Sequence, residues 1–121
     1  RNAKPADDRF ARAELFGVVG ENGKLDLAAV LAELARREVN ELQVEAGAIL
    51  SGAFLAAGLA DELLLYLAPK LLGDTAQPMA RLPALSALDE AATMTLVEQS
   101  PCGPDLRLRL LTGSPDVHRH R

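Results

Sequence analysis

A glycine turn between a strand-like segment and a helix-like segment is the feature of this sequence best suited to chemistry. Residues 41–46 alternate polar and apolar side chains, Gly47 follows, and residues 48–57 are small and apolar. The first amides of a helix have no partner within it, and the helix dipole is positive there, so this turn predicts an anion site. Close packing of a helix on a sheet explains the same pattern and is slightly favoured on these residues alone.

The turn does not match either of the common phosphate-binding motifs. Gly47 and Gly52 have the separation of a P-loop, but Ala53 stands where lysine is required. Ile49 occupies the place of the second glycine of a dinucleotide-binding fingerprint. Ser51 and Gly52 are expected near the first helical turn, where their small size would leave room for a phosphate.

Glu45 is the second candidate, because it lies one residue before the end of the predicted strand. Open α/β sheets bind ligands beyond the carboxyl ends of their strands, and a carboxylate there can accept hydrogen bonds from a polar ligand. A solvated glutamate on a half-exposed strand is the alternative interpretation.

No nucleophile–base pair can be assembled from this sequence. The histidines, His118 and His120, lie in the polar C-terminal tail, and Cys102 lies in a turn-rich loop far from them. Two exposed imidazoles without further ligands predict no metal site. Acid–base chemistry, hydride transfer and ligand binding remain as possible functions of this sequence.

The elements that must position these residues follow the order of an α/β domain. Asp26 is expected to cap a helix that Asn40 ends, and alternation places Arg107 and Arg109 on a solvated strand face. The predicted elements are a strand at 15–19, helices at 27–38 and 48–57, a strand at 41–46, a central strand at 62–68 buried on both faces, and a hairpin of strands at 93–99 and 106–110.

The composition bounds the function classes. The chain has 121 residues, 49% of them hydrophobic and 25% charged, and its net charge is −4. A negative charge and 3% aromatic residues disfavour a nucleic-acid partner. The apolar-looking stretch at residues 46–60 is shorter than the roughly 20 residues of a membrane span. Together with a single cysteine, these features predict a cytoplasmic protein that contacts neither nucleic acid nor membrane.

Several segments, in their order along the chain, resemble the reductase domain of the bifunctional riboflavin-biosynthesis pyrimidine deaminase–reductase. The resemblance runs from about Leu15 to Leu111. The segments are Gly23–Leu27, Val44–Gly47, Leu50–Ala53, Gly58–Leu63, Tyr66–Gly73 and Gly103–Leu106. This order matches the C-terminal part of that domain.

The resemblance implies a dihydrofolate-reductase-like α/β fold, with a mixed sheet of which this chain holds the C-terminal portion, ending in an antiparallel hairpin. It implies reduction of 5-amino-6-(5-phosphoribosylamino)uracil to the ribitylamino product, with NADPH as hydride donor. Glu45 would contact the substrate. The residues that would cradle the NADPH phosphates are Gly47, Ala48, Ile49, Leu50, Ser51, Gly52 and Ala53. Ala48 and Ile49 depart from the family, where glycine or proline with threonine is frequent.

The resemblance also implies that the sequence is a piece of a larger enzyme, with the domain part at 14–112. The polar ends of the sequence predict a flexible lead-in at 1–13 and a flexible tail at 113–121. Zinc would belong only to the deaminase domain, whose signature is not in this sequence. We expect the piece to be inactive alone. A non-catalytic folding or dimerisation module, or another reductase of the same fold, remains an alternative. A homodimer or larger homo-oligomer is left open.

Overall fold

The protein is described by a computed structural model for residues 10, 12–18, 20 and 24–113. Two compact units divide the chain, Arg1–Gln43 and Val44–Arg121, and each is described by itself. The division falls within the predicted domain part at 14–112. Most of the predicted lead-in and tail, including His118 and His120, lies outside the described residues.

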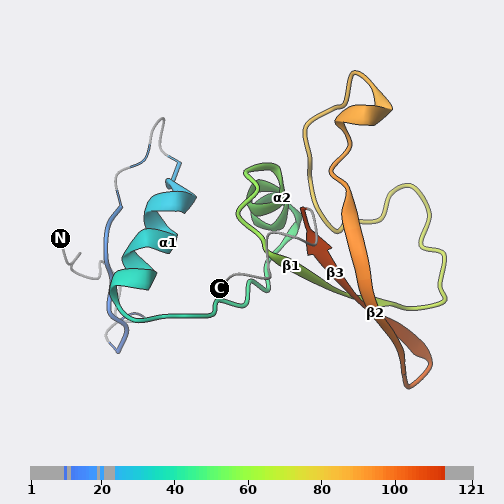
Figure 1. Ribbon diagram of the computed structural model, residues 1–121, viewed down its shortest axis with the longest axis horizontal. Helices are drawn as coiled ribbons and strands as arrows, with labels where there is room; N and C mark the ends of the chain where they lie inside the picture. The colour runs from blue at the N-terminus through green and yellow to red at the C-terminus, as the bar shows by residue number, and fades with distance from the viewer. Residues whose placement is uncertain (1–9, 11, 19, 21–23, 114–121) are drawn as a thin grey trace. The chain divides into compact units, whose positions relative to one another are not determined.

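Helix α1 (Leu27–Arg36) is the main element of the first unit (Figure 1). The predicted cap is confirmed, because the Asp26 carboxylate accepts a hydrogen bond from the Ala29 amide at 3.0 Å. The predicted end at Asn40 is wrong. Glu38 adopts φ 64° and its amide donates to the Ala35 carbonyl, which closes the helix earlier in the left-handed C-terminal motif.

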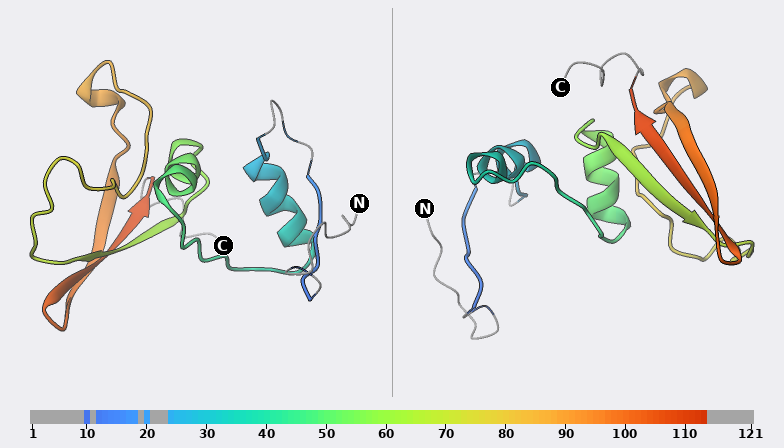
Figure 2. Two further views of the ribbon diagram at one scale, coloured as in Figure 1. Left: turned by 180° about the vertical axis from the view of Figure 1, so that it is seen from behind. Right: turned by 60° about the horizontal axis from the view of Figure 1, so that its bottom comes forward.

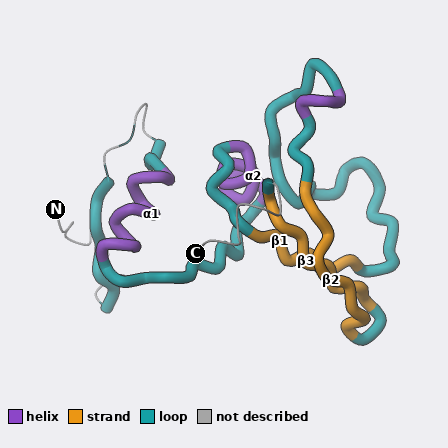
Figure 3. The backbone as a smooth tube through the Cα atoms, in the orientation of Figure 1, coloured by secondary structure: helices purple, strands orange, loops and turns teal. Residues whose placement is uncertain are grey.

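The two strands predicted on either side of α1 are not formed as predicted. Around Phe16 the described backbone makes a single bridge, and Val19 lies outside the described residues. Residues 41–46 form an exposed loop, drawn in teal in Figure 3. Alternating side chains favour a strand only where a neighbouring strand accepts its hydrogen bonds, and no described strand pairs with residues 41–46.

Helix α2 (Ala48–Ala56) opens the second unit and confirms the predicted helix at 48–57. Gly58 ends it at φ 64°, and the amides of Gly58 and Leu59 donate to the carbonyls of Leu55 and Phe54 at 3.1 and 3.0 Å. This is the glycine C-terminal motif that the sequence predicts. Phe54 is 8% exposed and is the one buried large apolar side chain among the described residues.

Three antiparallel strands complete the second unit: β1 (Glu62–Leu67), β2 (Met94–Cys102) and β3 (Asp105–Thr112). They lie in the order β1-β3-β2, as Figure 2 shows from two sides. The predicted hairpin of β2 and β3 is confirmed. Its turn is Gly103-Pro104, with Gly103 at φ 61°, as the first central residue of a type II′ turn requires.

The prediction that 62–68 is a central strand buried on both faces is wrong for the described sheet. Strand β3 is central, and β1 pairs with β3 alone among the described strands. Leu64, Tyr66 and Leu67 of β1 are 42%, 56% and 52% exposed. A continuous apolar run therefore marks side chains that can be buried on both faces, but it does not by itself supply the neighbours that bury them.

The two faces of the sheet differ in character. Leu63 and Leu65 stand opposite Leu110 and Leu108, which makes one face apolar. The other face carries the predicted arginines, each held by a glutamate. Arg109 pairs with Glu62 at 2.8 Å and thereby lowers the pKa of that carboxyl, and Arg107 pairs with Glu98 at 2.5 Å.

A register shift in β2 corrects one detail of the predicted alternation. The sequence pattern placed Glu98 with Met94 and Leu96, but the ladder shifts between Leu96 and Glu98. The extra residue of such a bulge reverses the alternation, so Glu98 lies opposite Arg109 on the charged face.

Residues 68–93 join β1 to β2 and contain the short 3-10 helix η2 (Leu88–Glu90). None of the helices in the described residues is long and apolar enough to cross a membrane.

Candidate functional site

The predicted anion site is formed by the start of α2. Gly47 is the N-cap in an extended conformation, with φ −69° and ψ 166°, and no side chain caps the helix. The first helical bond joins the Ser51 amide to the Gly47 carbonyl at 3.2 Å. The amides of residues 47–50 therefore have no acceptor within the helix, and the positive end of the helix dipole lies here.

Gly47 itself leaves this helix end open. A Cβ built on Gly47 would meet nothing within 4 Å. A ligand could therefore approach the backbone of this turn without meeting a side chain of residue 47. An open, uncapped helix start fits an anionic group such as a phosphate.

The hydroxyl of Ser51 is engaged in a hydrogen bond within the turn. It donates to the carbonyl of Ala46 at 3.2 Å, which ties the fourth helical residue back to the residue before the N-cap. This bond stabilises the turn. The predicted contact of Ser51 with a cofactor stays a prediction.

The small size of Gly52 predicted room for a phosphate beside it, and this prediction is wrong. Gly52 is buried, and a Cβ built on it would lie 2.0 Å from the carbonyl oxygen of Arg81. The backbone of Arg81 therefore fills the space beside Gly52. The Arg81 amide also donates to the Ala48 carbonyl at 2.8 Å.

A groove of about 410 Å³ runs along this turn. One wall is the turn itself, and the other is the segment of residues 77–81, which we call the crossing segment. The lining residues are Ala46, Gly47, Ala48, Ile49, Leu50, Gln77, Pro78 and Arg81. The groove brings together a helix N-terminus, apolar residues and one arginine, a set that suits a ligand with both an anionic and an apolar part.

Glu45 belongs to the same unit as the groove and precedes its first residue, Ala46. Its side chain is exposed, in a loop rather than at the end of a strand. The predicted juxtaposition of a carboxylate and an anion-binding turn is therefore present along the chain, two residues apart. Contact of Glu45 with a substrate stays a prediction.

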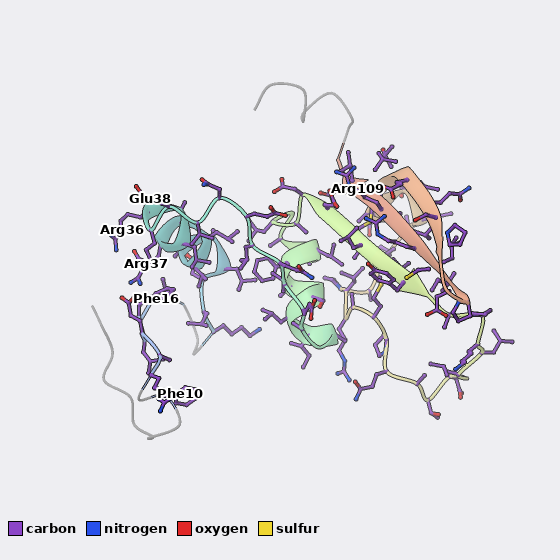
Figure 4. The ribbon with its side chains drawn as sticks, turned by 90° about the horizontal axis from the view of Figure 1, so that it is seen from below. Phe10, Phe16, Arg36, Arg37, Glu38 and Arg109 are labelled. Atoms are coloured by element: carbon purple, nitrogen blue, oxygen red, sulfur yellow. The ribbon has the colours of Figure 1, made fainter. Side chains whose placement is uncertain are left out.

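A second groove, of about 370 Å³, lies in the first unit against α1. Its charges are matched within the unit. Arg37 pairs with Glu14 and Glu33, both at 2.7 Å, and its guanidinium lies 4.6 Å from the centre of the Phe16 ring. Arg37 and Phe16 are labelled in Figure 4. Arg36 pairs with Glu33 at 2.6 Å. These contacts give the arginines of α1 a structural role within the first unit.

Gln77, Pro78 and Arg81 were not predicted from the sequence, because they lie in a polar, proline-containing stretch without a motif. One signal could have pointed to them. A glycine in the interior of a helix costs about 1 kcal/mol relative to alanine, and often marks close approach of another backbone. Gly52 is such a glycine.

Comparison with known proteins decides the family. The pattern of the family described as "RibD C-terminal domain" matches residues 2–108. The chain belongs to the RibD C-terminal domain family. Similarity to a RibD of known structure agrees: the chain resembles Acinetobacter baumannii RibD with a TM-score of 0.75 and 29% identity, over 90% of this chain and 30% of that one. The α/β, dihydrofolate-reductase-like fold expected from the sequence is thus confirmed.

Curated relatives carry names from riboflavin biosynthesis. The chain is 44% identical to "Riboflavin biosynthesis protein RibD" of Escherichia coli (strain K12), over 74% of this chain and 24% of that protein. It is 35% identical to the "5-amino-6-(5-phosphoribosylamino)uracil reductase" of Buchnera aphidicola subsp. Acyrthosiphon pisum, over 74% of this chain and 43% of that protein. The chain thus spans less than half the length of each of these relatives.

Proposed function

We propose that this chain supplies part of the active site of an NADPH-dependent reductase of riboflavin biosynthesis, acting on 5-amino-6-(5-phosphoribosylamino)uracil. The observation that carries the proposal is the open, uncapped start of α2, whose N-cap Gly47 lies two positions after Glu45, in a chain of the RibD C-terminal domain family. The name of the Buchnera relative supports the substrate.

The α2 turn would hold the anionic part of the cofactor. The amides of residues 47–50 and the helix dipole offer a preformed site for a phosphate, and Gly47 leaves the approach open. Ala48, Ile49 and Leu50 would bind through their backbones, so the absent threonine hydroxyl is not required. NADPH, when bound, supplies the hydride.

Glu45 would orient the substrate. Its carboxylate can accept hydrogen bonds from hydroxyl or amino groups, which both the ribose and the pyrimidine ring of the substrate offer. One residue, Ala46, separates Glu45 from Gly47 along the chain. The same short segment could therefore hold cofactor and substrate near each other, which is what hydride transfer between two bound molecules requires.

The Glu45→Ala variant of the natural protein tests this assignment. Loss of a hydrogen bond to a charged group costs about 1.5–3 kcal/mol, so kcat/KM for the pyrimidine substrate should fall about 10- to 100-fold. Substrate-dependent NADPH consumption measures the change. Glu41→Ala is the matched control, since Glu41 is also exposed in the loop but belongs to the first unit. Unchanged turnover of Glu45→Ala would remove Glu45 from the site.

The proposal extends to the setting of the protein. We place it in the cytoplasm, with a small-molecule substrate and with self-association into a homodimer or larger homo-oligomer. A single exposed cysteine, Cys102, supports a reducing compartment. Light scattering of the natural protein measures the oligomeric state directly.

A further inference from the structure

The contact between α2 and the crossing segment is tighter than a side chain would allow. A Cβ on Gly52 would lie 2.0, 2.7 and 2.8 Å from the carbonyl oxygen, carbonyl carbon and amide nitrogen of Arg81. All three atoms are backbone, so no rotation of a side chain can relieve the clash. Only glycine admits the crossing segment at this distance.

The crossing segment is fixed to the helix at a second point. The Arg81 amide donates to the carbonyl of Ala48, the first residue of α2, at 2.8 Å. Gly52 lies one helical turn further along, so the two contacts are on the same side of the helix. Together they set the distance between the crossing segment and the first turn of α2.

The same two contacts hold one wall of the groove against the other. Ala48 and Leu50 line one wall, and Gln77, Pro78 and Arg81 line the other. A shift of the crossing segment away from Gly52 would therefore move Arg81 and the wall to which it belongs away from the turn.

We propose that Gly52 is a positioning residue for cofactor binding, which acts through the crossing segment rather than by touching the cofactor. The inference rests on the proposed function, because it assigns the groove to NADPH. This positioning role takes the place of the direct contact between Gly52 and the NADPH phosphates that the family resemblance implies. The crossing segment becomes the second wall of the cofactor site.

The Gly52→Ala variant tests this inference, because helix propensity and the crossing segment predict opposite effects. Alanine in a helix interior is favoured by about 1 kcal/mol over glycine, so helix propensity alone predicts a variant that is at least as stable as the unaltered protein and binds NADPH as well. The crossing segment must instead move by about 1 Å or more to reach ordinary contact, and a misplacement of that size can weaken a site by about 100-fold.

We expect Gly52→Ala to raise the dissociation constant of NADPH by about tenfold or more, measured by titration of the natural protein without substrate. The KM for the pyrimidine substrate should stay within about twofold, a split that general loss of structure would not give. Gly17→Ala is the matched control, because a Cβ on Gly17 meets nothing within 4 Å. It should bind NADPH like the unaltered protein.

A pair of variants at Arg81 keeps the inference testable if Gly52→Ala does not fold. Arg81→Pro removes the amide that binds Ala48, whereas Arg81→Ala keeps it. We expect Arg81→Pro to bind NADPH clearly more weakly than Arg81→Ala. Equal loss in both would show that the guanidinium acts and the backbone contact does not, which would overturn the inference.

The outcomes separate this inference from the function on which it rests. If the unaltered protein does not bind NADPH, the proposed function fails and the inference falls with it. If the unaltered protein binds NADPH and Gly52→Ala binds it equally well, the positioning role is refuted and the proposed function stands.

Discussion

Replacement of Glu38 by glycine should stabilise the first unit. Glu38 follows α1 at φ 64°, in the left-handed region that glycine adopts freely. The amides of Glu38 and Val39 donate to the carbonyls of Ala35 and Leu34 at 2.9 and 3.1 Å, so the conformation closes the helix. Figure 4 shows the residue at the end of α1.

The size of the effect follows from two opposing contributions. A side chain in the left-handed region costs about 1–2 kcal/mol, and the extra freedom of glycine in the unfolded chain costs about 0.5–1 kcal/mol. The net gain in stability is about 0.5–1 kcal/mol. When this substitution is made in the natural protein, hydrogen exchange of the α1 amides should therefore be about two- to fivefold slower. Gly58→Ala is the control with the opposite change, because it removes a glycine from a left-handed position. Gly58 holds the same position after α2 at φ 64°, and alanine there should speed exchange of the α2 amides by a similar factor or more.

Faster exchange of α1 in Glu38→Gly would refute the reasoning. It would mean that Glu38 makes a stabilising contact in solution, or that α1 does not end at this residue. Slower exchange in Gly58→Ala would contradict the same argument at the second helix.

Three further outcomes are expected. Asp26→Ala should destabilise α1 by about 1 kcal/mol through loss of the cap to Ala29, seen as faster exchange of its first amides, and no change would show that the cap is not formed. The pKa of Glu33 is lowered to about 2, first by its hydrogen bond to Arg36 and then by that to Arg37. A lowered pKa stabilises the fold above the ordinary value, so this stabilisation should be lost as pH falls from about 4.5 towards 2; Glu33→Gln should lack that part of the acid transition in denaturation by acid. Added salt should weaken the same effect, and salt independence would contradict an ionic origin.

The helices and the hairpin could be predicted because local signals fix them. Asp26 caps α1 and Gly58 ends α2. The alternation of leucine with Arg107 and Arg109 predicts the strand β3, which pairs with β2. Each signal acts within a few residues, so it needs no knowledge of the rest of the fold.

The failures share the opposite property. Residues 41–46 have the side chains of a paired strand and β1 has those of a central strand, yet pairing and burial depend on neighbours that local sequence does not specify. The bulge between Leu96 and Glu98 is likewise set by the ladder rather than by composition. Periodicity reports which face a side chain prefers, not which strand lies beside it.

The candidate site divides in the same way. The uncapped start of α2 was predictable from Gly47 and the helix that follows it. The crossing segment was not, because the contact between Gly52 and Arg81 joins residues with no shared motif. Tertiary contact gives Gly52 its role.

The most direct test of the proposed function is to follow the hydride itself. The natural protein is incubated with 5-amino-6-(5-phosphoribosylamino)uracil and NADPH that carries deuterium at the transferable position, and the product is analysed by mass spectrometry. We expect one deuterium in the ribitylamino product, formed only when both molecules are present. Product without deuterium, or no product at all, would contradict the proposal that this family member transfers hydride from NADPH to the pyrimidine substrate.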